Sequence, residues 1–168
     1  ILKDAGARLV LTDMALEEVY THIVAADAEF RNHYMAIEPI IGEDEAILLD
    51  RILIRSYFYA KLQLTSGVRP PKGWVDYIRQ FVDYGGLHNG LALDGFRVNI
   101  CSRFGFEYEA REETCRGLDG EEIDKINVAL IEERGEEKKQ AEKRALNDAL
   151  NVLRVYNMRS ENREQMVP

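Results

Sequence analysis

The chain has 168 residues, of which 46% are hydrophobic and 31% charged. This length and composition predict one folded domain with a sizeable core and exclude a disordered chain. The formal net charge is −8, which excludes nucleic-acid binding through a general positive charge; a local basic patch or a bound cation would be needed. No apolar run approaches the roughly 18 residues of a membrane-spanning helix, so we expect no membrane segment.

The cysteines bear on the cellular location, and the start of the chain bears on whether the sequence is a fragment. Cys101 and Cys115 lack the spacing of a zinc site or of a disulfide framework. They favour free thiols and a cytoplasmic location, although one disulfide between them stays open. The chain starts without Met or a signal-peptide pattern, and we expect it to be a piece of a longer protein.

The first part of the chain predicts a short strand followed by a long helix. Residues 1–6 resemble a helix end, and the apolar run of residues 9–11 indicates a strand over residues 8–12. Residues 13–35 carry apolar side chains three and four positions apart, which is typical of a helix with one buried face. Thr12 or Asp13 would cap this helix. The apolar stripe comprises Leu16, Val19, Tyr20, Ile23 and Ala26.

The middle and end of the chain predict further helices separated by turns. Residues 44–64 have a broad apolar face, so we expect one continuous, well-buried helix there. A loop is expected at residues 85–90. Other helices are expected at residues 74–84, 91–105, 120–134 and 136–158, and a second short strand at 106–110. The broad face comprises Ile47, Leu48, Ile52, Leu53, Tyr57 and Phe58.

These elements predict an α/β protein that is predominantly helical, with a small parallel sheet flanked by helices. We expect a single domain over residues 1–168. Residues 136–168 would form a C-terminal helix that returns to the core. The charged segment 136–145 is expected to face solvent.

Glu18 is the first candidate for chemistry. In helical projection, Glu18 and His22 lie together at one edge of the apolar stripe, so Glu18 could stand at the boundary of core and solvent. The two side chains are four residues apart and could share an ion. Alternatively, Glu18 is a solvated acid beside an imidazole.

Asp148 is the second candidate. It interrupts an apolar-rich helical stretch, where Asp is unfavourable because its side chain competes for backbone hydrogen bonds. A metal or a partner would explain it, and so would a salt bridge to Lys143, Arg144 or Arg154.

Together, the stretches "LTDMALEEV" and "LNDALNVLRVYNMR" resemble the PIN-domain nucleases. The resemblance implies a metal-dependent ribonuclease, in which carboxylates hold Mg²⁺ or Mn²⁺ and a metal-activated water cleaves RNA. By position, Glu18 and Asp148 would be the catalytic metal ligands, with Glu17 as the weaker choice for the first. The resemblance also implies a large helical insertion over residues 40–135, and two more carboxylates upstream of Ile1 and beyond Pro168. The resemblance is also compatible with a toxin of a toxin–antitoxin pair, a homodimer or an antitoxin-like partner.

The most basic part of the chain suggests substrate contacts. Arg51, Arg55 and Lys72 are the main candidates for binding RNA phosphates, and Arg69 and Arg79 of the same stretch are further possible phosphate contacts. The aromatic residues between 57 and 84 favour a core, with a stacking surface for bases as the alternative. His88, in a Gly-rich loop, indicates no site by itself. The competing function is a non-catalytic helical interaction module, in which both acids are surface residues and segment 136–145 contacts a partner.

Overall fold

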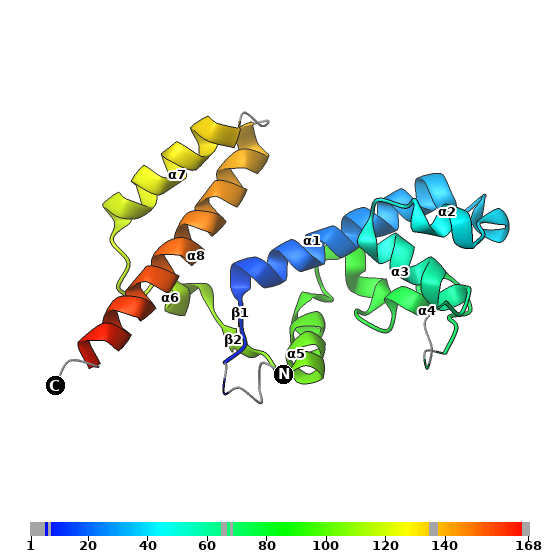
Figure 1. Cartoon of the computed structure of the whole chain (residues 1–168), viewed down its shortest axis with the longest axis horizontal. Coiled ribbons are helices and arrows are strands. Elements are labelled where there is room, and N and C mark those ends of the chain that lie inside the picture. The colour runs from blue at the N-terminus through cyan, green and yellow to red at the C-terminus, as the bar shows by residue number, and fades with distance from the viewer. Residues whose placement is uncertain (1–5, 7, 65–66, 68, 135–137, 166–168) are drawn as a thin grey trace. The chain divides into compact units, whose positions relative to one another are not determined.

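The structure is a computed structural model that describes residue 6 and residues 8–64, 67, 69–134 and 138–165 (Figure 1). It is 70% helical with a small two-stranded parallel sheet, which confirms the predicted fold class. The chain forms two compact units. The first comprises Ile1–Leu9 and Leu16–Glu107, and the second Val10–Ala15 and Tyr108–Pro168. The helix expected over residues 1–6 falls mostly outside the described residues.

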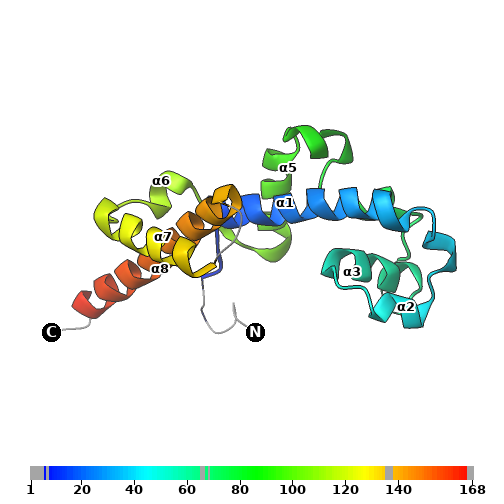
Figure 2. The ribbon, with the colours of Figure 1, turned by 90° about the horizontal axis from the view of Figure 1, so that it is seen from above.

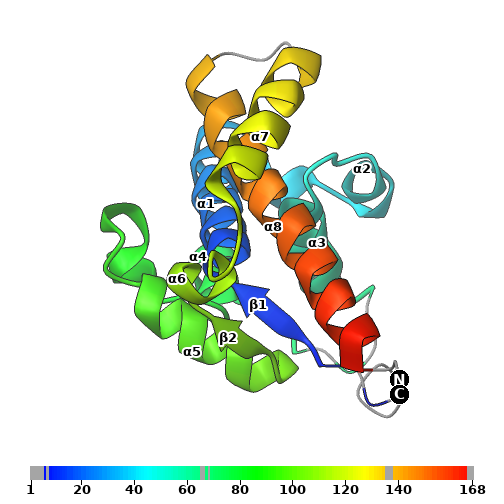
Figure 3. The same ribbon diagram turned by 90° about the vertical axis from the view of Figure 1, so that its left-hand side faces the viewer.

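The sheet pairs two strands that are far apart in sequence. Strand β1 (Val10–Thr12) lies beside β2 (Glu107–Glu109) (Figure 3). The Glu107 amide donates a 2.8 Å hydrogen bond to the Leu9 carbonyl. Parallel strands need a long crossover connection, and here the helices from α1 to α5 supply it.

Helix α1 (Asp13–Glu29) begins where the sequence predicts. The Thr12 hydroxyl caps it by accepting a 3.3 Å hydrogen bond from the Ala15 amide. A π-helical turn, η1 (Phe30–Tyr34), follows. Val19 was expected in the buried stripe but is 45% exposed, because it lies at the edge of that face. The buried face comprises Leu16, Tyr20, Ile23, Ala26, Asp27 and Phe30.

The prediction of one continuous helix over residues 44–64 is wrong. Two shorter helices, α2 (Glu43–Ile47) and α3 (Ile52–Lys61), lie side by side (Figure 2). Arg51 adopts an extended backbone between them, with φ −76° and ψ 112°. This turn separates the two halves of the predicted apolar face. Tyr57 and Phe58 are buried, whereas Ile47, Leu48 and Ile52 are exposed.

Aromatic side chains fill the core of the first unit. Phe30 stacks on Trp74 of α4 (Trp74–Ile78), with ring centroids 4.3 Å apart and planes 6° apart. Tyr57 meets Phe30 edge to face at 5.3 Å. Because the rings of Tyr57, Phe58 and Trp74 are buried, they form a core, as favoured, and are not available to stack on bases.

Short helical turns complete the first unit. The helix expected at residues 74–84 ends at Ile78, and the loop expected at 85–90 forms a 3₁₀ helix, η3 (Tyr84–Asn89). The Tyr20 hydroxyl donates 2.8 Å and 3.3 Å hydrogen bonds to the carbonyls of Leu87 and Gly86, which ties η3 to α1. The remaining elements are η2 (Glu38–Ile40) and α5 (Leu93–Phe104).

The second unit is built on a helical hairpin. Helices α7 (Gly120–Arg134) and α8 (Lys138–Gln165) pack against each other (Figure 1). Ala145, Ala149 and Leu150 of α8 are buried. A short helix, α6 (Arg111–Thr114), contacts α8. Most side chains of the charged segment 136–145 lie outside the described residues.

The sequence predicts no membrane segment and leaves one disulfide between the two cysteines open. Within the described residues, no helix combines the length and the apolar character needed to cross a membrane. Cys101 and Cys115 are both free thiols.

We expect the buried tyrosines to make the folded protein less stable at high pH. Burial raises the pKa of Tyr20, Tyr57, Tyr77 and Tyr84, and the Glu38 carboxylate raises that of Tyr57 further. An unfolded tyrosine ionises near pH 10. Because the folded pKa is higher, these groups stabilise the fold below about pH 10, and this contribution is lost as the pH rises further.

We therefore expect the free energy of unfolding to fall above about pH 10, with phenolate absorbance rising as the chain unfolds. Urea denaturation at stepped pH, followed by circular dichroism and ultraviolet absorbance, measures both. If all eight tyrosines ionised near pH 10 while the circular dichroism stayed native, the prediction would be wrong.

Candidate functional site

The two predicted metal ligands belong to different units. Glu18 is an exposed residue of α1 in the first unit, and Asp148 is a half-buried residue of α8 in the second. Glu18 was expected at the boundary of core and solvent. It is exposed instead, as is His22, because the buried face of α1 runs through Leu16, Tyr20 and Ile23.

Acidic side chains mark the carboxyl end of both strands in the second unit. Asp13 follows β1 and accepts a 2.9 Å hydrogen bond from the Tyr108 hydroxyl. Glu109 ends β2 and receives two 3.2 Å hydrogen bonds from the Arg154 guanidinium of α8. This ion pair is three-quarters or more buried on both sides. Ligands of open α/β sheets bind outside the carboxyl ends of the strands, so a site is expected at this edge.

A second contact holds α8 near the same edge. Arg111, which follows β2, donates a 3.4 Å hydrogen bond to the Asn147 side chain. Asn147 is 1% exposed and precedes Asp148. By sequence, Asp148 was the polar residue that needed an explanation, but the structure buries its neighbour. Arg154, one of the salt-bridge partners considered for Asp148, binds Glu109.

The predicted substrate contacts lie in the first unit. Arg51 pairs with Glu29 and is only 33% exposed, so its charge is largely matched within the fold. Arg55 is half-buried on α3, and Lys72 is exposed. The Lys72 amide donates to Asp76 of α4, which fixes the backbone there. Lys72 is therefore the most accessible of the three.

The described residues contain no metal centre with three or more protein ligands. Across the described residues, no group of three or more His, Cys, Asp or Glu side chains is arranged to hold a metal ion. A site made of Glu18 and Asp148 alone is smaller than such a group and stays a prediction.

The most densely connected polar group of the first unit is Asp27, whose side chain is fully buried on α1. Its Oδ1 accepts 2.8 Å hydrogen bonds from the Trp74 indole N–H and the Tyr84 hydroxyl. His88 Nε2 lies 2.7 Å from Oδ2, and Arg31 lies 3.8 Å from the same oxygen. We call Asp27, Arg31, Trp74, Tyr84 and His88 the Asp27 cluster.

Charge explains the pattern of donors in the Asp27 cluster. A carboxylate only accepts hydrogen bonds, so His88 donates through Nε2–H. Burial raises the pKa of Tyr84, the bond to Asp27 raises it further, and Arg31 and Arg79 lower it. The cluster thus joins α1, α4 and η3 through one acceptor.

Comparison of the sequence with family models and with curated proteins, and of the fold with solved structures, found no match.

Asp27 was missed at the level of sequence, and His88 was set aside. A signal for Asp27 was present, because it lies four residues after Ile23 and three before Phe30, on the buried face of α1. A charged residue on an apolar face needs partners. His88 gave no comparable signal, since its partner is 61 positions away in sequence.

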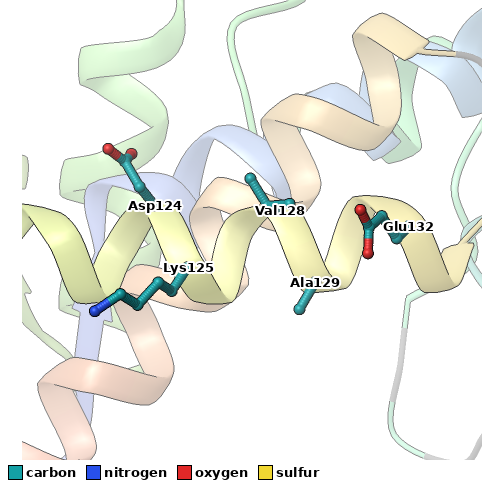
Figure 4. A pocket seen from close by; sticks show the side chains of 5 residues that line it. All are labelled: Asp124, Lys125, Val128, Ala129 and Glu132. Atoms are coloured by element: carbon teal, nitrogen blue, oxygen red, sulfur yellow. The ribbon is translucent and has the colours of Figure 1, made fainter.

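One hollow on the surface offers less chemistry. It is lined by residues of α7 alone, and Figure 4 shows that their side chains point in different directions rather than toward one another. They are Asp124, Lys125, Val128, Ala129 and Glu132.

Replacing the buried carboxylate should destabilise the first unit. Asp27→Asn removes the charge that three donors share, so we expect the free energy of unfolding to fall by about 2–3 kcal/mol. Trp74, the only tryptophan in the chain, should also change its fluorescence emission in the native state. Urea denaturation followed by fluorescence measures both.

Asp94→Asn is the matched control, because Asp94 is 88% exposed and pairs with Arg97 at the surface. It should change stability by no more than about 0.5 kcal/mol. Equal effects of the two substitutions would contradict the role assigned to Asp27.

Proposed function

We propose that the protein is a metal-dependent ribonuclease of the PIN-like kind, with Glu18 and Asp148 as ligands of Mg²⁺ or Mn²⁺. The observation that supports it best is the parallel pair of β1 and β2. At its carboxyl edge, the Arg154–Glu109 ion pair and the Arg111–Asn147 bond hold the part of α8 that carries Asp148.

The chemistry follows from the carboxylates. Oxygen ligands suit hard divalent cations, and a shared cation offsets the repulsion between two carboxylates. The ion would lower the pKa of a bound water and stabilise charge on the phosphorus oxygens during hydrolysis of an RNA phosphodiester. Asp13, held by Tyr108, adds negative charge near the end of β1.

Substrate binding would use the first unit. Lys72 is exposed and Arg55 half-buried, so both could reach phosphates. Arg51 would have to release Glu29 or contact RNA with its remaining donors.

A second function is favoured by a different observation. Large apolar side chains are exposed on both units, including Ile40, Leu48 and Ile52 at 78%, 79% and 70%. Exposed apolar surface often marks contacts with other proteins. A non-catalytic interaction module, or a nuclease bound by an antitoxin-like partner, would use them.

The nuclease proposal predicts cleavage that depends on metal and on two carboxylates. In the complete natural protein, Glu18→Gln and Asp148→Asn should each lower the rate of Mn²⁺-dependent RNA cleavage by about a hundredfold or more, because each removes a charged ligand. Cleavage of a labelled single-stranded RNA, with Mn²⁺ binding measured by calorimetry, tests this.

Matched substitutions separate catalysis from general charge effects. Asp124→Asn and Glu132→Gln change exposed carboxylates of α7. Both should leave cleavage and Mn²⁺ binding within about twofold of the natural protein. If Glu18→Gln and Asp148→Asn behaved like these controls, the site assignment would be wrong. An interaction module would show no cleavage in any variant.

The proposed substrate-binding residues predict a change in salt dependence. Arg55→Gln combined with Lys72→Gln should weaken RNA binding about tenfold or more, because two cations no longer meet RNA phosphates. The slope of log affinity against log salt should fall by about 1 for each of the two side chains. Fluorescence anisotropy with a labelled RNA at several salt concentrations measures both. An unchanged slope, equal to that of the exposed-lysine control Lys125→Gln, would exclude a role of these side chains in binding.

A further inference from the structure

Two members of the Asp27 cluster, Arg31 and His88, have side chains that reach the surface. Arg31 is 53% exposed and His88 is 43% exposed, although both approach the fully buried Asp27 carboxylate. Arg79, at the end of α4, is also exposed. Asp27 thus orients His88 by a hydrogen bond and attracts the Arg31 guanidinium, while both side chains remain partly accessible to a ligand.

Arg79 directly follows α4, the helix whose Trp74 indole donates to Asp27. Both Arg79 and Arg31 lower the pKa of Tyr84 through their charge, opposing Asp27. The Tyr84 hydroxyl is itself 2.8 Å from Asp27. The Arg79 side chain forms no hydrogen bond or ion pair with any other described residue.

The hydrogen bond to Asp27 also fixes the outer side of His88. Because Nε2–H donates to the carboxylate, the other ring nitrogen, Nδ1, is left without a partner among the described residues. When the imidazole is protonated, Nδ1 also becomes a donor. An anion at the surface could then accept a hydrogen bond from it.

Nearby acids are already engaged. Asp27 accepts three hydrogen bonds. Asp83, the next acid along the chain, accepts a 3.2 Å hydrogen bond from the Gly85 amide. Asp27 supplies one negative charge beside two guanidiniums and an imidazole, so the group can accept a further anion.

We propose that Arg31, Arg79 and His88 form a phosphate-binding site, and that Asp27 is its positioning residue. Guanidinium groups bind phosphate oxygens through paired charge-assisted hydrogen bonds, and an imidazolium adds a further donor. The site lies within the first unit and uses neither Glu18 nor Asp148. It goes beyond the proposed nuclease activity and does not depend on it.

The two oxygens of Asp27 face different surroundings. The indole of Trp74 and the hydroxyl of Tyr84 already satisfy one carboxylate oxygen from inside the unit. The second oxygen faces His88 and Arg31, which lead outward to solvent.

The test is a titration of the whole chain with inorganic phosphate at constant ionic strength and without divalent metal. Nuclear magnetic resonance follows the imidazole signals of His88, with His22 and His33 as internal controls, since both are exposed and lie outside the cluster. We expect the His88 signals to shift saturably and those of His22 and His33 to stay in place. A second arm replaces phosphate by a single-stranded oligoribonucleotide.

Variants assign the binding to the named side chains. Arg79→Gln should weaken phosphate binding about tenfold, the change expected for one charge-assisted contact. Arg116→Gln, an exposed arginine of the second unit, should leave it unchanged. Asp27→Asn should shift the His88 signals without ligand and weaken phosphate binding, while Asp27→Glu should restore part of both.

The outcomes are distinct. Tighter binding of the oligoribonucleotide than of phosphate would identify backbone phosphates as the ligand, and binding of phosphate alone would identify a small phosphate compound; both support the site. An absence of saturable His88 shifts in both arms, with Arg79→Gln equal to Arg116→Gln, would overturn it. Loss of RNA cleavage in Glu18→Gln has no bearing on this result, because the phosphate titration needs neither metal nor cleavage.

Discussion

The buried carboxylate of Asp27 is the constraint on which the first unit depends. An unpaired charge in a core costs several kcal/mol, so the chain must bring donors to it. Trp74, Tyr84 and His88 do this from α4 and η3. The same requirement places Trp74 against Phe30, where the two rings stack. The polar cluster and the aromatic core are therefore parts of one packing arrangement, because Trp74 belongs to both.

In the second unit, polar side-chain interactions stabilise a very small sheet. Its two strands are three residues each and provide few ladder hydrogen bonds. Side chains compensate at their carboxyl ends, where Tyr108 holds Asp13, and Arg154 of α8 holds Glu109. Because both interactions are charge-assisted, they are stronger and more directional than apolar contacts. The edge that they stabilise is also the place where open α/β folds bind their ligands.

Local sequence patterns predicted the structure well where the signal lies within a few residues of the element. The Thr12 cap and the bounds of α7 follow from signals within a few residues of each element. The prediction for residues 44–64 failed because a run of apolar residues fits one long helix as well as two short ones. The turn at Arg51 was decided by the burial of Tyr57 and Phe58 against distant aromatic rings. The candidate site shows the same division: Glu18 and Asp148 come from sequence motifs, whereas His88 acquires a role only through Asp27.

The sequence by itself determined the helical α/β class, the positions of most helices and the aromatic content of the core. Periodicity and capping are local, and they act over a few residues along the chain. Only the tertiary structure decided that Asp27 is buried, that His88 is its partner 61 positions away, and that Asn147 rather than Asp148 is enclosed by the second unit. Burial and charge pairing depend on segments that meet in space. No local pattern encodes which donor will reach a buried carboxylate, because that choice is made when the helices pack.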